Sequence, residues 1–212
     1  MAEGLAAILE QMQSRVGVEN APGDWFLVTQ DRVNQFADVT GDHQFIHVDP
    51  ERAKNTPFGG TIAHGFLTLS LCLMLPRYKE NGSNNEATPP PARSAEGPQM
   101  KMAVNYGMNK VRFPSPVPVG KRIRAKTKLL SVEEVAPNCL QNVNQITIEV
   151  EGLEKPAAVI ELAGRQYYSA TTPGGPAQTP AGPPGLPAPC PRRAQRPIKC
   201  IPRRFAVGQA FG

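Results

Sequence analysis

Histidine and cysteine are both scarce in this chain. The 212 residues hold three histidines, all between positions 43 and 64. The four cysteines, at positions 72, 139, 190 and 200, form no C-x-x-C pair, so the standard spacing of a zinc site is missing. The sequence also opens without an apolar secretory leader. We therefore expect a protein of the reducing cytoplasm.

Long hydrophobic runs and glycine-rich phosphate loops are missing as well. The most apolar run, residues 62–75, includes His64, Thr68 and Ser70 and is followed by Pro76. A run of this length is too short to span a bilayer and is typical of a buried core helix. We therefore expect no membrane association, and no nucleotide site of the phosphate-loop kind.

Positive charge is confined to the end of the chain. Residues 169–212 contain ten prolines, six glycines, six Lys or Arg and no acid, and without those six charges the net +5 becomes −1. The rest of the chain is nearly neutral, which argues against a nucleic-acid partner. We predict a folded domain over residues 1–168 and a disordered tail over 169–212, because the tail is too poor in apolar residues to form a core.

Helix signals occupy the first part of the domain. Apolar spacing predicts an amphipathic helix over 2–13, and residues 25–28 are typical of a strand. Asp31 is the expected cap of the next helix, which Gly41 ends. Asp49 is the expected cap of a short helix that begins at Pro50, and a long helix is predicted over 61–75.

Strand signals follow a long loop predicted over 77–98. Alternating or β-branched residues predict strands over 100–106, 121–132, 142–151 and 157–168, with turns between them. Helices followed by consecutive strands indicate an α+β domain, with an antiparallel sheet wrapped around one long helix.

The histidine-containing segment is the candidate site. Asp42 and His47 lie five residues apart after the predicted end of a helix, where a loop can bring a carboxylate and an imidazole to one water. Singly, each residue could be structural, as a turn aspartate or a satisfied histidine. His64 is expected to orient the loop or to cap backbone groups rather than react. A metal held by some of Asp42, His43, His47, Asp49 and His64 is the rival reading, but their spacing matches no standard site, and we expect no metal.

The same segment carries a family resemblance. Residues 36–53 and 57–67, which include GDHQFIHVD at 41–49 and GGTIAHG at 59–65, resemble the hydratase motif of the MaoC-like family. The chain is similar in particular to the nodulation-protein-N-like branch of this family. That similarity rests on the sequence of residues 41–49, on NYGMNKVRFP at 105–114 and on PVG at 118–120. The resemblance covers about residues 25–168. The chain departs from the family at Gln44-Phe45, at Phe66 and at Ala163-Gly164, and a glycine weakens a strand interior.

The resemblance implies a hot-dog fold and an (R)-specific enoyl-CoA hydratase that uses no cofactor. It gives Asp42 and His47 the acid–base roles, without deciding which activates water, and makes the Gly65 N–H the donor to the thioester oxygen. Ser70 could reach the substrate, and Lys110, Arg112 and Arg122 could meet the phosphates of coenzyme A. A homodimer is expected, since a second subunit would cover the open sheet edge. The alternatives are a thioesterase on the same fold and a non-enzymatic binding or signalling protein that acts through its tail.

Overall fold

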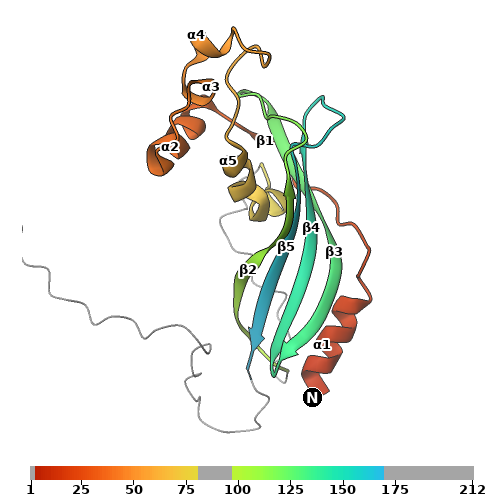
Figure 1. Cartoon of the computed structure of the whole chain (residues 1–212). Helices are drawn as coiled ribbons and strands as arrows, with labels where there is room; N and C mark the ends of the chain where they lie inside the picture. The colour runs from red at the N-terminus through yellow and green to blue at the C-terminus, as the bar shows by residue number, and fades with distance from the viewer. Residues whose placement is uncertain (1–2, 81–96, 170–212) are drawn as a thin grey trace, which may run out of the picture. The chain divides into compact units, whose positions relative to one another are not determined.

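The computed structural model describes residues 3–80 and 97–169. The predicted tail from residue 170 and residues 81–96 of the predicted loop lie outside this part, so both stay predictions. The chain divides into two units, Met1–Pro173 and Gly174–Gly212, and the first is described here (Figure 1). Its elements are α1 (Glu3–Gln13), β1 (Phe26–Leu27), α2 (Gln30–Thr40), α3 (Phe45–Val48), α4 (Pro50–Ala53), α5 (Gly65–Ser70), the 3₁₀ helices η1 (Leu71–Leu73) and η2 (Leu75–Arg77), β2 (Met100–Arg112), β3 (Arg122–Ala136), β4 (Cys139–Val150) and β5 (Ala158–Tyr168).

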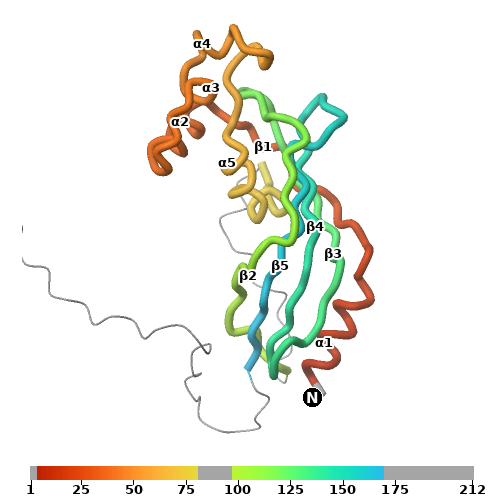
Figure 2. Tube along the Cα trace, in the orientation of Figure 1, coloured from red at the N-terminus to blue at the C-terminus, as the bar shows by residue number. Residues whose placement is uncertain are grey.

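The strands form one antiparallel sheet in the order β1-β3-β4-β5-β2. The trace in Figure 2 shows that the four long strands lie side by side and curl together. All four long strands were predicted, although β2 continues to Arg112, beyond the expected end at Tyr106. Because the helices precede these strands, the α+β prediction is confirmed.

For α2, the predicted N-cap was wrong and the predicted C-terminal end was confirmed. Asp31 does not cap this helix. Thr29 does, because its extended backbone (φ −86°, ψ 154°) lets the side-chain oxygen accept from the Arg32 N–H. At the other end Gly41 adopts the left-handed conformation (φ 79°) and donates to the Ala37 carbonyl, as predicted. Asp49 caps α4 as expected and accepts from the Arg52 N–H at 3.0 Å.

The predicted long helix over 61–75 was wrong in extent. Residues 61–63 are extended instead, since Ile62 bridges to Pro118 and the Ala63 N–H donates to the Val117 carbonyl at 2.8 Å. The helix begins at Gly65, stays α-helical to Ser70 and continues as 3₁₀ turns to Arg77. Within residues 3–80 and 97–169, no helix is both long and apolar enough to cross a bilayer.

Two hydrophobic clusters stabilise the domain. The first core joins α5, η1 and η2 to one face of the sheet, and its members include Leu67, Leu75, Ile123, Ile148 and Ile160. The second core is smaller and joins α1 to the other end of the long strands; its buried members are Leu5, Val132, Leu140 and Tyr168. The sheet therefore carries a helical cover at each end.

The glycine in the last strand does not interrupt it. Gly164 pairs with Asn142 on β4 and with Asn105 on β2, and β5 is continuous around it. A Cβ at position 164 would lie 3.0 Å from Oδ1 of Asn142. The missing side chain therefore makes room for that amide.

Candidate active site

The first acidic group of the site follows the end of α2. Because Gly41 turns the backbone into the left-handed region, the chain leaves the helix and exposes Asp42. The short helix α3 follows and carries His47, whose side chain is buried. The local sequence thus brings an exposed carboxylate and a buried imidazole to neighbouring positions.

The tautomer of His47 follows from its partner. Nδ1 lies 2.7 Å from the carbonyl oxygen of Ile62. Since a carbonyl oxygen can only accept, Nδ1 carries the proton and Nε2 keeps its lone pair. Burial lowers the pKa of His47 below its ordinary value, and the nearby His64 lowers it further, against the opposing effects of the Ile62 carbonyl and Asp42. The ring is therefore a neutral base near pH 7.

His64 connects the two segments. Its Nε2 donates to the backbone carbonyl of Asp42 at 2.9 Å, so it orients the Asp42 loop, as the sequence indicated. Its ring stacks on that of His47, with centroids 3.8 Å apart and an angle of 29° between the planes. Phe36 packs on it with a centroid distance of 5.1 Å. Nδ1 of His64 is buried and has no hydrogen-bond partner among the described residues.

The three groups form one compact site. A carboxylate oxygen of Asp42 and a ring nitrogen from each of His47 and His64 all lie within 4.8 Å of one another. A water with two hydrogen bonds of about 2.8 Å can bridge a gap of this size. The distance therefore leaves room for one water between the Asp42 carboxylate and a ring nitrogen of His47.

By distance, Asp42, His47 and His64 could together hold a metal ion, although the two imidazole rings are stacked. A cation bound by two imidazoles lies near the plane of each ring, in line with both lone pairs. The rings of His47 and His64 are stacked with an angle of 29° between their planes, which departs from that arrangement. The other metal candidates are engaged elsewhere, since His43 pairs with Asp38 at 2.9 Å and Asp49 caps α4.

Gly65 is the first residue of α5. Its N–H precedes the first intrahelical bond, and His64 at the N-cap makes no side-chain capping bond. A Cβ at this position would lie 3.4 Å from the ring of Phe113, which follows β2. The Cα of Gly65 therefore lies close to an aromatic ring, with little room for a side chain.

The remaining predicted contacts are dispersed. Ser70 is exposed, and its hydroxyl donates to the Phe66 carbonyl at 2.7 Å. Lys110 and Arg112 lie exposed near the end of β2, close in sequence to Phe113. Arg122, at the start of β3, forms a two-pronged ion pair with Glu151.

One supporting residue was missed by the sequence analysis. Nε2 of Gln30 donates to the His47 carbonyl at 2.7 Å, and its Oε1 accepts from the Thr61 hydroxyl at 2.6 Å. This side chain fixes α3 against the extended segment before α5. No local signal could have indicated it, because its partners lie 17 and 31 residues away.

Comparison with known proteins gives the family. The sequence profile described as "MaoC like domain" matches residues 11–81. The 3-hydroxyacyl-thioester dehydratase Z of Mycobacterium tuberculosis is 48% identical over 150 residues, which cover 71% of this chain and 89% of that protein. Nodulation protein N of Rhizobium leguminosarum bv. viciae is 41% identical over 150 residues, with coverage of 70% and 84%.

Solved structures give the fold. The (R)-hydratase of A. caviae involved in PHA biosynthesis matches with a TM-score of 0.50 and 24% identity over 70% of this chain and 94% of that one. A monoamine oxidase regulatory protein from Archaeoglobus fulgius matches with a TM-score of 0.54 and 22% identity, with coverage of 73% and 91%. The expected hot-dog fold is thus confirmed. The chain belongs to the MaoC-like dehydratase family, with relatives named 3-hydroxyacyl-thioester dehydratase Z and nodulation protein N, and is a hydro-lyase.

Proposed function

We propose that this hydro-lyase adds water reversibly to a trans-2-enoyl-CoA to give the (R)-3-hydroxyacyl-CoA. The observation that carries the proposal is the carboxylate of Asp42 within 4.8 Å of the His47 and His64 nitrogens. The thioester class is supported by the name of the mycobacterial dehydratase relative. The (R) configuration rests on the family resemblance.

The proposed chemistry moves one proton and uses no cofactor. A water between Asp42 and Nε2 of His47 loses a proton to this pair while its oxygen bonds to C3 of the enoyl group. The proton is then delivered to C2, so the atoms of one water are added across the double bond. Acid–base help of this kind contributes roughly 10²–10⁴ to the rate. His64 holds Asp42 in place through the backbone carbonyl.

The thioester oxygen gains negative charge while C3 is attacked. We assign its stabilisation to the Gly65 N–H, which lies at the start of α5 without a side-chain cap. The ring of Phe113 lies beside Gly65. Phe66, the residue after Gly65, is 69% exposed. These two rings supply apolar surface for the substrate beside the reacting carbonyl.

For the coenzyme A phosphates we retain Lys110 and Arg112, which are exposed beside Phe113 on the chain. Arg122 is a weaker candidate, since its guanidinium is already bonded to Glu151. Ser70 would need to release the Phe66 carbonyl before its hydroxyl could donate to a substrate.

The decisive experiment follows the absorbance of crotonyl-CoA. Asp42→Asn keeps the size of the side chain and removes the carboxylate, so turnover should fall by about 10²–10⁴. Asp38→Asn is the matched control, because Asp38 pairs with His43 outside the site. Unchanged turnover in Asp42→Asn would refute the acid–base assignment. A thiol reagent in the same assay detects the rival thioesterase reaction, which would release free coenzyme A.

We further propose a homodimer formed through β2. This strand pairs with β5 only, so its second edge has no partner within the described residues. Apolar side chains along it are 38–59% exposed: Met100, Met102, Val104, Tyr106 and Met108. Val104→Lys should shift the protein to monomer in analytical ultracentrifugation. Val39→Lys, the same change at an exposed position on α2, should not.

The cytoplasmic location is likewise a proposal. Cys72 and Cys139 are buried free thiols, and burial raises the pKa of the Cys72 thiol, which keeps it protonated. Buried, unpaired cysteines suit a reducing compartment.

A further inference from the structure

The side chain of Gln30 is bonded in three directions. Gln30 is the first residue of α2 and is half-buried. Its Nε2 donates to the His47 carbonyl at 2.7 Å and to Oδ1 of Asn34 at 2.9 Å, and its Oε1 accepts from the Thr61 hydroxyl at 2.6 Å. Both amide protons and the amide oxygen are therefore in use. One side chain thereby joins α2, α3 and the extended segment before α5.

Backbone carbonyls determine the direction of each bond in this network. The His47 carbonyl can only accept, so the Gln30 atom beside it belongs to the NH₂ group. The amide oxygen then faces Thr61, whose hydroxyl must donate. At the other end, the Ile62 carbonyl fixes the proton on Nδ1 of His47. The network therefore has one arrangement of donors, in which Nε2 of His47 keeps its lone pair.

The same network fixes the place of the His47 ring. The Ile62 N–H donates to the Ile46 carbonyl at 3.0 Å and the Ile62 carbonyl accepts from the His47 ring, so one residue bonds α3 twice. Gln30 adds a third connection, between the His47 carbonyl and the Thr61 hydroxyl. His47 and Thr61 are both buried, and hydrogen bonds shielded from water are the stronger ones. α3 therefore cannot slide along the extended segment without breaking the bond from Gln30.

The two ends of the Gln30 bridge differ in their own support. The Thr61 carbonyl accepts from the Val119 N–H at 2.9 Å, and the Ala63 N–H donates to the Val117 carbonyl at 2.8 Å, so the extended segment is tied to the chain before β3. α3 has only four residues and no side-chain cap. A helix of one turn has little stability of its own. The bridge therefore holds a weakly supported helix to a well-supported segment.

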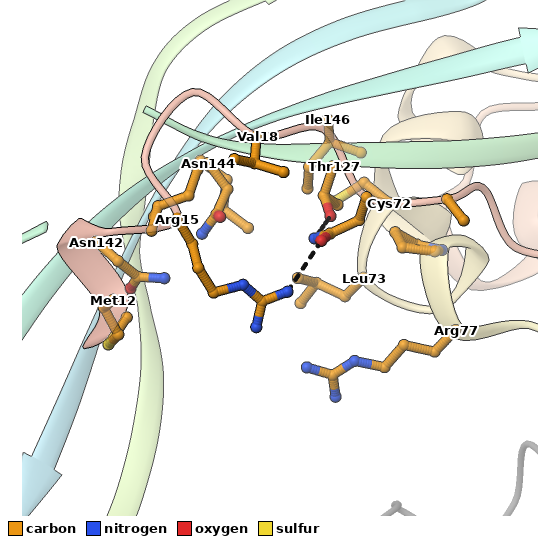
Figure 3. Close-up of a pocket in the computed structure, with 15 residues that line it drawn as sticks. Met12, Arg15, Val18, Cys72, Leu73, Arg77, Thr127, Asn142, Asn144 and Ile146 are labelled. Carbon is orange, nitrogen blue, oxygen red and sulfur yellow. Dashed lines mark hydrogen bonds between the residues drawn. The ribbon is translucent and has the colours of Figure 1, made fainter. Parts of the chain in front are cut away.

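This bridge lies apart from the cavity in Figure 3. That cavity, of about 560 Å³, lies between the two hydrophobic clusters, and its lining includes Cys72 of the first cluster and Met12, which packs against the second. None of its described lining residues is Gln30, His47 or Thr61. A substitution at Gln30 therefore changes the bridge and leaves the wall of this cavity as it is.

We propose that Gln30 is a positioning residue for the hydration reaction and acts through the place of the His47 ring. This inference rests on the proposed function, in which Nε2 of His47 and the Asp42 carboxylate share one water. Without the amide, α3 is held to the extended segment by Ile62 alone. A displacement of about 1 Å at a reacting group can lower a rate about a hundredfold. The role of Gln30 is to prevent that displacement.

Gln30→Met is the test, because methionine keeps the length of the side chain and removes all three hydrogen bonds. The full chain is assayed with crotonyl-CoA. The kcat should fall about ten- to a hundredfold with KM within about twofold, since the substitution misplaces a reacting group and touches no substrate. Gln35→Met is the matched control: Gln35 lies on the same helix and donates to Asp31 within it at 2.8 Å. It should keep the parent kcat.

Thr61 offers a second and milder test of the same bridge. Thr61→Val removes the hydroxyl donor at nearly constant volume and leaves the bond from Gln30 to His47, so kcat should fall less than in Gln30→Met. Thr61→Ser restores a hydroxyl and should recover the parent kcat. This pair separates the hydrogen bond from the packing of the side chain.

A second measurement does not depend on turnover. The Nδ1 proton of His47 lies in a buried bond of 2.7 Å, so proton NMR should show it as a slowly exchanging signal in the parent and in Gln35→Met. In Gln30→Met this proton should exchange at least about tenfold faster, because the ring separates from Ile62 more often. The comparison can be made even if the parent does not hydrate crotonyl-CoA. Failure of the proposed function is thus distinguishable from failure of the positioning role.

Three outcomes would overturn the proposal. One is a parent-like kcat in Gln30→Met protein that melts at the parent temperature. Another is an equal loss of kcat in Gln35→Met, and the last is unchanged exchange of the His47 proton in Gln30→Met. Where Gln30→Met does not fold, Thr61→Val decides instead, and a parent-like kcat together with parent-like proton exchange in that variant would overturn the role.

Discussion

The catalytic segment and the sheet hold their polar groups in different ways. Around Asp42, each group is fixed by a side chain bonded to a distant backbone carbonyl, as His47 is to Ile62 and His64 to Asp42. On β4, the positions of Asn142 and Asn144 follow from strand alternation and from pairing on both sides. The first arrangement depends on single side chains, whereas the second depends on the whole sheet. Substitutions should therefore disturb catalysis in the first region and stability in the second.

Among the tests of this comparison, the largest effect is expected at Gly65. Gly65→Pro removes the proposed oxyanion donor at a helix position that tolerates proline, and His64 before it already has φ −59° and ψ 139°, which suits a residue preceding proline. The kcat for crotonyl-CoA hydration should fall by about 10²–10³. Gly65→Ala adds a similar Cβ but keeps the N–H, so it should retain most activity. Equal losses in both variants would indicate crowding against Phe113 rather than a lost donor.

On the sheet, replacement by alanine should destabilise the protein unequally at two positions of β4 whose side chains lie on the same face. Ile148→Ala removes a fully buried side chain from the first core and should lower the free energy of unfolding by about 2–4 kcal/mol. Asn144 lies four residues away in the same row and is half-buried. Asn144→Ala should lower the free energy of unfolding by less than about 1 kcal/mol. Urea denaturation of both variants measures the difference. Equal costs would mean that Asn144 is packed as core.

The third test compares two histidines of the catalytic segment. Burial lowers the pKa of His47, whereas the hydrogen bond from exposed His43 to Asp38 raises the pKa of His43. Protonation of His47 removes its free lone pair, so kcat/KM should fall about tenfold per pH unit below that lowered pKa. His43→Asn should leave this acid limb unchanged. If the acid limb shifts in His43→Asn, the titrating group is His43 and not His47.

The same lowered pKa affects stability. Between the folded pKa of His47 and its ordinary value near 6.5, the unfolded chain binds more protons than the folded one. The free energy of unfolding should therefore rise with pH across this window and decrease as the pH falls through it. Urea midpoints of the parent protein and His47→Gln, measured from pH 7 to pH 5, should converge towards the acid end.

The smallest effect concerns the start of α2. Thr29→Ala removes the N-cap acceptor and should cost about 1 kcal/mol of stability. Asp31→Ala should cost only a few tenths, because Asp31 lies in the first turn and contributes through the helix dipole. Thermal melts of the two variants give the ranking. The reverse order would restore Asp31 as the cap.

Local signals in the sequence predicted much of this fold. Gly41 and Asp49 marked a helix end and a helix start correctly, and alternation located the four long strands. Thr29 was missed because Asp31 is an equally good capping residue by type. The helix over 61–75 was predicted too long because an apolar run does not show that residues 61–63 bond to residues 117–119.

Only part of the candidate site could be predicted in the same way. Asp42 and His47 are five residues apart, so their proximity follows from a short loop. The bond from His64 to the Asp42 carbonyl spans 22 residues, and the support from Gln30 spans 17. Such contacts depend on tertiary packing, for which a single sequence carries no local pattern. The sequence contains Asn142 and Asn144 of β4, but it does not show that they lie between the two hydrophobic clusters.

The fit between Gly164 and Asn142 has an evolutionary consequence. A Cβ at position 164 would lie 3.0 Å from Oδ1 of Asn142, so a first change at 164 carries the cost of shifting that amide by a few tenths of an ångström. A shorter residue at 142 would relieve that penalty. In a library randomised at both positions and selected for folding, bulkier residues at 164 should emerge together with smaller ones at 142.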